Sequence, residues 1–576
     1  MERRAGAVRA LLFAILLFFC CGETPFAADR DSAASELRIA VSEFPKRLFL
    51  IGTPLTTGAA YVRGFVGRSL TIYDKSWAVA CSLCTELPTF ENHGAEIVTR
   101  ADGTKGVDVI FDLDPGLAWD DGVAVTTQDV LFSIEVAHRF GGSSSALPNI
   151  LDAVALDEHR VKLRIGSVRY DYNRMDDLFL LPAHIEKPIF DAANSLEEYK
   201  AHSLYTVEPA AAGLAYGPYK VTQFSPSEIA LTRNPYWRGK RPSFDRIVLR
   251  KFTDFASVSD ALAQKQVDMV SGESGLDLPG IYRIEAADQK SSYNFIYKST
   301  LKYMHIDLNL SNELLKDKRI RRALLLSLDR PIVRDEQDRA ASGGAPRSFL
   351  VPTSPNFDPT IPPAPFDPAQ ADALFTAAGF ERGADGIRVD ARGRRLAFRL
   401  AAELDWDTNK RIAEVIAAQL RKAGVDVTVE DQRMSEILPK RQFDLAFYVW
   451  FNVPEFPLEP VYARSGIPTA ENGYRGLNFP GFDNDEMNKV AESLNTELNP
   501  AKRLLLWRRA QQIYAEELPA LPLGFGLTEY IVPANMTGVE PTGHMIPTSY
   551  WVEDWQMHCA GSPAWLIAAL GANLTK

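Results

Sequence analysis

Two cysteines with two residues between them are the clearest candidates for chemistry in this sequence. Cys81 and Cys84 could close a short disulfide loop in an oxidising compartment, which would leave Cys559 unpaired. A redox-active pair needs a thiolate stabilised at a helix start, whereas the flanking residues are typical of a loop. A metal site would need two further ligands, and only His93 is close in sequence. We therefore expect a structural disulfide or two inert thiols, with redox or metal chemistry as the alternative.

Other catalytic and ligand-binding motifs are incomplete. Residues 272–276 approach a nucleophile elbow but have Leu in place of the final Gly. None of the eight histidines belongs to a zinc-binding His-Glu-x-x-His pattern, and no Gly-rich loop ends in Gly-Lys-Ser/Thr to hold a nucleotide phosphate. Residues 524–526 lack the third Gly of a dinucleotide turn, and residues 112–116 lack the later ligands of a calcium loop. The sequence predicts no enzyme active site, no metal and no cofactor.

Composition narrows the class of protein further. The chain has 576 residues, of which 46% are hydrophobic and 24% are charged, so it can bury large cores and is not of the disordered or disulfide-scaffold type. At about 150 residues per domain, this length predicts three to four domains. The formal net charge is −11, which provides no broad basic surface for nucleic acid or anionic lipid.

The N-terminus has the features of a secretory signal. Three arginines precede an apolar run at residues 10–21, and small residues follow at Ala27 and Ala28. The run is too short to span about 30 Å of hydrocarbon as a helix. We expect residues 1–28 to be a signal peptide, and we expect a soluble protein that is periplasmic or extracellular.

A lipid anchor is the alternative outcome of the same signal. Cys20 or Cys21 could be lipidated after cleavage, which would tether the protein to a membrane. Phe18 and Phe19 lie where a lipoprotein signal needs small residues. We therefore expect both cysteines to be ordinary members of the apolar run.

Strand and helix patterns alternate along the rest of the chain. A strand is expected at residues 37–41, another at 103–113, and a helix at 126–138 that Thr126 and Asp129 cap. Further strands are expected at 219–221, 228–232, 246–250, 267–270, 304–310, 425–429 and 445–449, and further helices at 257–265, 317–328, 368–378, 408–423 and 500–518. Residues 335–366 are rich in Pro, Gly, Ser and Asp and predict a long surface excursion. Repeated passages between helix and strand indicate α/β lobes with mixed sheets.

A set of short motifs, kept in order over about residues 37–550, resembles a known family. The set comprises residues 65–74, Trp-Asp-Asp-Gly at 119–122 with the helix start after it, 217–220, 231–237, 261–268, 318–330, 371–380 and 516–523. Together these motifs resemble the bacterial extracellular solute-binding proteins of family 5, the oligopeptide- and dipeptide-binding components of ABC importers. Trp119 and the capped helix are expected to serve packing and helix initiation.

The resemblance implies the α/β, two-lobed periplasmic-binding-protein fold, type II-like, with an extra subdomain in the first lobe and a hinge-closed cleft between the lobes. The chain should cross to the second lobe near residue 300 and return near 525. The implied divisions are signal peptide 1–28, lobe I 29–77 and 206–300, its extra subdomain 78–205, lobe II 301–525, and a return with the C-terminal tail at 526–576.

The resemblance also indicates where a ligand would bind. In many peptide-binding members an Asp after a second-lobe strand pairs with the peptide's α-ammonium, but residues 447–457 contain no Asp, and Glu455 is the nearest carboxylate. Trp450 and Phe451 could form an apolar platform beside Asn452, or could pack in the core. Arg475 could pair with a ligand carboxylate, or could be an exposed, solvated side chain.

The implied function is a monomeric solute receptor that binds peptides and delivers them to a membrane permease with separate ATPase subunits. Opines, sugars and metal complexes are alternative ligands on the same fold. An exported hydrolase or thiol-redox protein that uses Cys81 and Cys84 is the alternative from another class, and a sensor built on this fold is a third possibility.

Overall fold

The computed structural model describes residues 35–558 apart from 43, 46, 49–56, 140–149, 273–277, 289, 335–345, 347 and 406. All the described elements belong to the unit that begins at Glu36. The expected signal peptide, Cys20, Cys21 and Cys559 lie outside the described residues. Among the helices that are described, none is long and apolar enough to cross a membrane.

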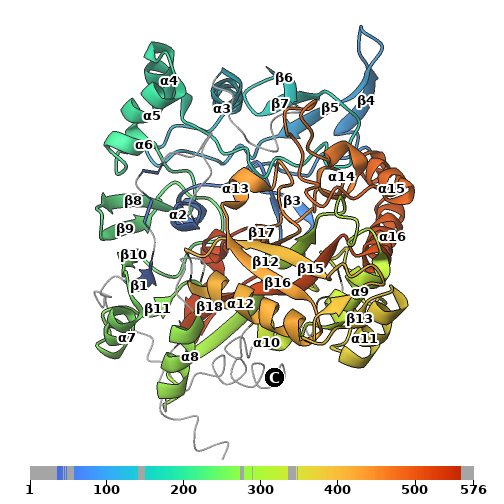
Figure 1. The fold of residues 1–576 in the computed structure, drawn as a ribbon. Coiled ribbons are helices and arrows are strands. Elements are labelled where there is room, and N and C mark those ends of the chain that lie inside the picture. Colours follow the sequence, from blue (N-terminus) through green and yellow to red (C-terminus); the bar gives the residue numbers. More distant parts are fainter. Residues whose placement is uncertain are drawn as a thin grey trace, which may run out of the picture. The chain divides into compact units, whose positions relative to one another are not determined.

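A ten-stranded mixed sheet organises the described chain (Figure 1). Its strand order is β16-β15-β17-β12-β18-β11-β1-β10-β9-β8. One end consists of β1 (Glu36–Val41), β8 (Tyr219–Phe224), β9 (Glu228–Arg233), β10 (Arg246–Lys251) and β11 (Met269–Val270). The other end consists of β15 (Ala397–Ala402), β16 (Asp426–Asp431) and β17 (Leu445–Phe451).

Two long antiparallel strands join the two ends of this sheet. They are β12 (Tyr293–Leu308) and β18 (Ala520–Pro533), and their pairing shifts register between Ser299 and Tyr303 and again between Met304 and His305. Such irregularities bend and twist a strand locally. We call the body around β1 and β8–β11 lobe I and the body around β15–β17 lobe II; β12 and β18 run through both.

Lobe I carries a second sheet of four antiparallel strands in the order β4-β5-β7-β6. Its strands are β4 (Ala95–Thr99), β5 (Lys105–Asp112), β6 (Ile150–Ala155) and β7 (Arg160–Ile165). A short hairpin of β2 (Thr71–Tyr73) and β3 (Val79–Cys81) precedes it. The helices of this lobe are α2 (Thr57–Val66), α3 (Thr127–Arg139), α4 (Ala183–Ala192), α5 (Leu196–His202), α6 (Leu204–Val207), α7 (Phe255–Ala263) and α8 (Leu278–Ala287). The chain returns to lobe I through β19 (Met536–Thr537), η3 (Thr548–Asp554) and β20 (Gln556–Met557), and η3 packs on α2.

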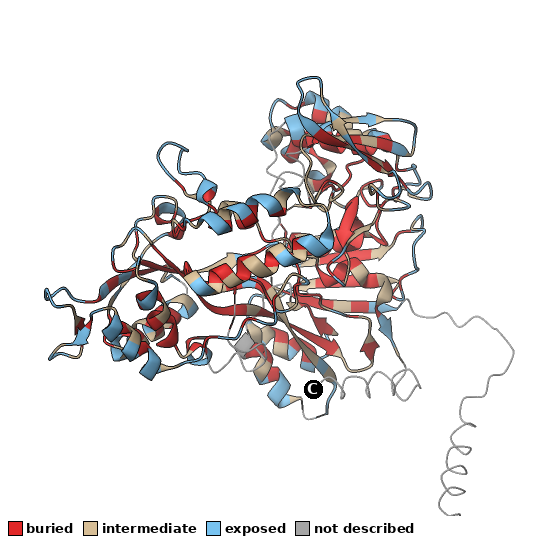
Figure 2. Cartoon of the chain, turned by 90° about the vertical axis from the view of Figure 1, so that its right-hand side faces the viewer, coloured by how far each residue is buried: buried red, intermediate tan, exposed pale blue. Residues whose placement is uncertain are grey.

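Lobe II covers its part of the sheet on both faces. Its elements are α9 (Lys318–Leu326), α10 (Arg330–Arg334), α11 (Pro368–Ala377), β13 (Glu381–Arg382), β14 (Arg388–Val389), α12 (Asp407–Lys422), α13 (Met434–Ile437), α14 (Leu458–Tyr462), η2 (Arg464–Gly466), α15 (Asp485–Thr496) and α16 (Pro500–Glu517). Because side chains alternate along a strand, Ile306 and Leu308 join the core that contains α9, α11 and α12, while Tyr303 lies on the other face. Figure 2 shows the buried strands of the sheet, with exposed positions on the outer sides of the helices.

Most of the expected elements are confirmed with small shifts of their ends. In α3, the backbone N–H of Thr126 donates to Asp129 Oδ2 (2.8 Å) and the Thr126 hydroxyl accepts from Gln128 N (3.2 Å), which is the expected capping arrangement. The strand expected at residues 304–310 is wrong in extent, because β12 already begins at Tyr293 and its bulges interrupt the alternation of side chains.

The surface excursion expected at residues 335–366 is confirmed in part, since every proline from Pro352 to Pro365 is exposed, but it is wrong for residues 349–351. Phe349, Leu350 and Val351 are buried. The Phe349 ring packs against Phe456 and Tyr514, with centroids 4.5 and 5.2 Å apart. This short apolar run packs into an aromatic cluster beside α16. Composition does not predict its burial, because the residues around it are rich in Pro and Ser.

Candidate functional site

The five expected site residues occupy two separate stretches of lobe II. Trp450 and Phe451 end β17, Asn452 follows directly, and Glu455 lies in the loop before α14. Arg475 lies in the loop between η2 and α15. The expected site residues are therefore divided between the β17 end and a second loop some twenty residues further on, and the hollow lined by Arg475 includes none of the other four.

Trp450 is half-buried and serves packing. It lies opposite Tyr303 of β12 in the sheet, and its ring centroid is 6.4 Å from those of Tyr448 and Phe479. These contacts place it between two hydrophobic clusters of lobe II. These contacts agree with the interpretation that Trp450 packs in the core.

Phe451 points the other way and is 68% exposed. It lies opposite Lys302 of β12, whose Nζ is 5.9 Å from the Phe451 ring centroid. A large apolar ring exposed next to a strand that runs through both lobes is available for a ligand contact.

Asn452 is almost fully buried, and its amide is only partly satisfied. Its backbone N–H donates to Leu301 O (3.0 Å), and its Nδ2 donates to Phe349 O (3.3 Å). Asn452 Oδ1 is buried and has no hydrogen-bond partner among the described residues. A buried acceptor without a partner costs free energy, so a ligand or water donor at this atom would be favourable.

A group of polar and aromatic side chains lies on the sheet face that carries Trp450, and the sequence analysis did not predict it. The Tyr448 hydroxyl donates to Asp307 Oδ2 (2.6 Å), His305 Nε2 lies 3.3 Å from Asp307 Oδ1, and the Tyr303 ring stacks on His305. Burial and the adjacent Asp307 charge raise the pKa of Tyr448. The group lines an internal cavity of about 10 Å³, which is room for roughly one water. Its only sequence signal is the period-two spacing of residues 303, 305 and 307.

Glu455 already has partners within lobe II. Its carboxylate pairs with Arg503 of α16, accepts from Trp507 Nε1 (3.2 Å) and accepts from Asn356 Nδ2 (3.4 Å). Burial raises the pKa of Glu455, and the Arg503 guanidinium opposes that shift. The expected role of Glu455 as an anchor for a ligand ammonium stays a prediction, and these contacts compete with it.

The Glu455–Arg503 pair also lies at a contact between the lobes. The Arg503 guanidinium is 3.6 Å from the ring centroid of Tyr170, and Tyr170 N donates to Asn495 O (3.2 Å). Tyr170 belongs to the segment of lobe I whose next residues, Tyr172 and Met175, are buried in the lobe I core. Sequence reasoning missed Tyr170 and Arg503, since no local pattern marks either residue.

Arg475 lines an open hollow of about 790 Å³ on lobe II. This volume is within the range of small-molecule sites. The hollow is lined by Glu459, Pro460, Ser465, Gly466, Glu471, Asn472, Gly473, Arg475 and Gly476. Its loop is held by reciprocal hydrogen bonds between Thr469 and Asn472, in which each backbone N–H donates to the other side chain (2.9 and 3.3 Å). Arg475 is exposed at this rim and can reach a ligand carboxylate without breaking a core contact.

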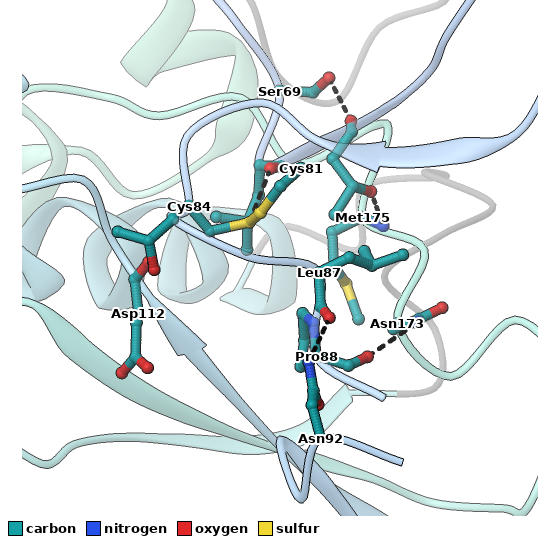
Figure 3. The surroundings of a disulfide bond; sticks show 12 residues. Ser69, Cys81, Cys84, Leu87, Pro88, Asn92, Asp112, Asn173 and Met175 are labelled. Atoms are coloured by element: carbon teal, nitrogen blue, oxygen red, sulfur yellow. Dashed lines mark hydrogen bonds between the residues drawn. A yellow bond between two sulfur atoms is a disulfide. The ribbon is translucent and has the colours of Figure 1, made fainter. Parts of the chain in front are cut away.

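The two cysteines are joined in a disulfide (Figure 3). Cys81 ends β3, and its Cα lies 5.4 Å from that of Cys84. The backbone of Cys84 forms an isolated antiparallel β-bridge with Leu113, the residue after β5. Cys81 lies at a strand end and not at a helix start, which is the position typical of reactive cysteines. Among the described residues no group of three or more His, Cys, Asp or Glu side chains could hold a metal ion.

The sequence profile of the bacterial extracellular solute-binding proteins, family 5 (middle region), matches residues 100–467, more than half of the chain. The chain belongs to this family. The resemblance seen in the motifs is thereby confirmed.

Known members and their structures agree with this assignment. The family 5 chain is 24% identical over 486 residues to the oligopeptide-binding protein AppA of Bacillus subtilis strain 168, covering 80% of this chain and 82% of AppA. An oligopeptide-binding protein of Thermus thermophilus, complexed with a pentapeptide, matches with a TM-score of 0.65 and 21% identity, over 91% of this chain and 96% of that one. NikA of Brucella suis, in complex with Fe(III)-EDTA, matches with a TM-score of 0.71 and 18% identity, over 91% of this chain and all of that one. The expected two-lobed α/β fold is confirmed, whereas the residue limits expected for its parts stay a prediction.

Proposed function

We propose that this protein is the extracytoplasmic receptor of an ABC importer, that it binds a peptide between its lobes, and that it delivers the peptide to a membrane permease with separate ATPase subunits. The observation that carries the proposal is the family match over residues 100–467, together with relatives named for oligopeptide binding. Export through a signal peptide at residues 1–28 belongs to the same proposal. So does a role in binding and not in catalysis, because the family's members bind solutes.

The hinge of this receptor is proposed to be the pair β12 and β18. These strands run through both lobes, and the shifts in their pairing between Ser299 and His305 offer places where the backbone can bend. Closure of the lobes about this pair would bury a solute beside the exposed Phe451 ring.

Arg475 is proposed to bind the negative charge of the ligand. Its guanidinium is exposed on a hollow of about 790 Å³, whereas the Glu455 carboxylate is already held by Arg503 and Trp507. An Arg binds a carboxylate through parallel N–H donors, so the C-terminal carboxylate of a peptide fits this position. A ligand with a free carboxylate is therefore expected to bind more tightly than its amide.

Calorimetric titration tests the proposal with peptides of two to nine residues and with their C-terminal amides. The wild type is expected to bind at least one peptide series and to lose about tenfold in affinity when the peptide is amidated. Arg475→Gln should show the same tenfold loss for the free peptide and should bind the amide no more weakly than that. Arg392→Gln, at an exposed turn of lobe II, is the matched control and should bind like the wild type.

Native mass spectrometry of the purified protein identifies any bound solute independently. A co-purified sugar, opine or metal complex, with no binding of any peptide, would contradict the peptide proposal and leave the receptor fold intact. Turnover of a peptide or ester substrate that disappears in Cys81→Ser would contradict the receptor proposal itself.

A further inference from the structure

Trp77 lies at the tip of the β2–β3 hairpin of lobe I and has an unusual backbone conformation. Its φ angle is +71°, in the left-handed region that bulky side chains rarely adopt. The hairpin belongs to lobe I, because Leu70 N donates to Leu178 O (3.0 Å) and Ser82 N donates to Leu70 O (3.1 Å). A strained conformation persists only where its surroundings hold it, so the position of this ring needs an explanation.

The side chain of Trp77 is buried in a hydrophobic cluster of lobe II. Only 8% of the residue is exposed, and it shares the cluster with Leu301, Tyr303 and Phe349. The edge of the ring remains attached to lobe I: Nε1 donates to Thr542 O (3.2 Å), and the His544 ring packs against it with centroids 5.3 Å apart. Trp77 thus connects the return segment of lobe I with the aromatic core of lobe II.

The tip that carries Trp77 is held in place by short-range contacts. Asp74 Oδ1 accepts from Ser76 N (2.8 Å) and Ala78 N (3.0 Å), which closes the turn. Lys75 Nζ pairs with Glu540 (2.8 Å) and Asp554 (3.1 Å) of the return segment. The turn and these pairs tie the tip of the hairpin to the return segment of lobe I.

The Cys81–Cys84 disulfide constrains the base of the same hairpin. Thr71 of β2 pairs with Cys81 of β3, directly beside the covalent link. The disulfide therefore limits the freedom of the strand that leads away from Trp77.

We propose that Trp77 is the positioning residue through which lobe I holds lobe II in the closed arrangement, and that it sets how long a bound solute stays. Opening about β12 and β18 would have to withdraw the ring from the cluster and expose its apolar surface, which disfavours the open state. The effect on the solute rests on the proposed function. The effect on the lobes does not, since it can be measured without any solute.

Small-angle X-ray scattering of the full, solute-free protein tests the effect on the lobes. Trp77→Ala is expected to increase the radius of gyration, and Trp77→Phe is expected to stay near the wild type because it keeps an aromatic ring in the cluster. Trp77→Gly deletes the ring and suits the positive φ, so this variant keeps the hairpin even if Trp77→Ala folds poorly. Trp237→Ala, at a half-buried lobe I tryptophan whose Nε1 donates to Lys240 O, is the matched control.

Hydrogen exchange and solute release separate a positioning role from a merely structural one. Faster exchange of residues 301–303 and 348–351 in Trp77→Gly, at an unchanged far-UV spectrum, is expected. For a peptide that binds the wild type, release should be roughly tenfold faster or more in Trp77→Gly, with restoration in Trp77→Phe. Wild-type scattering and exchange in both Trp77→Ala and Trp77→Gly would overturn the proposal. A change in scattering with no peptide binding by any variant would uphold the effect of Trp77 on the lobes while contradicting the proposed function.

Discussion

The guanidinium of Arg503 lies over the ring of Tyr170, 3.6 Å from its centroid, and so links α16 of lobe II to the segment of lobe I between β7 and α4. The same guanidinium pairs with Glu455. The family resemblance led us to expect that the Glu455 carboxylate faces a ligand. In the structure it pairs with the Arg503 cation at a contact between the lobes. A cation over an aromatic face is stabilised most where water is excluded, and the Arg503 side chain is only 11% exposed.

Glu455→Gln should therefore act mainly on stability. The side chains of the pair are 11% and 15% exposed, and removing one partner of a mostly buried pair leaves the other charge uncompensated. We expect the free energy of unfolding to fall by about 3 kcal/mol in urea titrations at neutral pH. Glu471→Gln, an exposed carboxylate of the neighbouring loop, is the control and should change it by less than about 0.5 kcal/mol.

The double variant Glu455→Gln with Arg503→Met distinguishes the pair from a ligand anchor. Removal of both charges should restore part of the lost stability, because no unpaired charge is left. If Glu455→Gln is as stable as the wild type and loses affinity only for peptides with a free amino terminus, Glu455 is the ammonium anchor and the interpretation as an internal pair is wrong.

Reduction of the Cys81–Cys84 disulfide should lower stability by a moderate amount. The bond closes a loop with a sequence separation of three, for which loop-closure entropy predicts about 2 kcal/mol. Cys81→Ser with Cys84→Ser should show this loss in urea titrations, and dithiothreitol should produce it in the wild type. An equal effect of dithiothreitol on the double variant would show that the loss does not come from reduction of the Cys81–Cys84 bond.

Local patterns were sufficient for much of the secondary structure but not for the contacts of the site. The capping of α3 depends on Thr126 and Asp129, which are three residues apart, so the sequence displays it directly. The Glu455–Arg503 pair joins residues 48 apart. Its formation depends on how the loop after β17 meets α16, which no periodicity encodes.

The position of Trp77 shows the same limit. The Asp74–Ser76 turn is a recognisable local signal, since an Asp side chain readily accepts from the backbone two residues on. Nothing in that turn indicates that the next side chain enters the core of the other lobe. The family resemblance implied two lobes, but the side chains that bridge them became visible only in three dimensions.

His544 should make stability depend on pH in the acidic range. Its Nε2 donates to Asp74 O (3.0 Å) and its Nδ1 accepts from Ile546 N (3.2 Å), an arrangement that requires the neutral ring. Burial lowers the pKa of His544 from 6.5 to about 4. Between these values the unfolded chain binds more protons than the folded one, so stability rises with pH and is lost as pH falls from 6.5 to 4, by about 3 kcal/mol in total.

Comparison with His544→Gln isolates this contribution. Asp176 acts in the opposite direction, because burial raises its pKa to about 6 and stability from that group falls as pH rises from 3.8 to 6. The difference between wild type and His544→Gln in urea titrations at pH 4.5, 5.5 and 7 cancels the Asp176 effect. His138→Gln, on the exposed side of α3, should keep the wild-type slope, and an equal slope in His544→Gln would contradict the assignment.

Phe451 should affect solute binding without affecting stability. The residue is 68% exposed, so Phe451→Ser removes little buried surface and should change the free energy of unfolding by less than about 0.5 kcal/mol. If a solute covers the ring on closure, loss of that apolar contact should weaken binding by roughly tenfold or more. Leu505→Ser, at an α16 side chain that is 62% exposed, is the matched control for loss of an exposed apolar group. Calorimetric titration of a peptide that binds the wild type measures both variants, and equal affinities for the two would place the solute away from the end of β17.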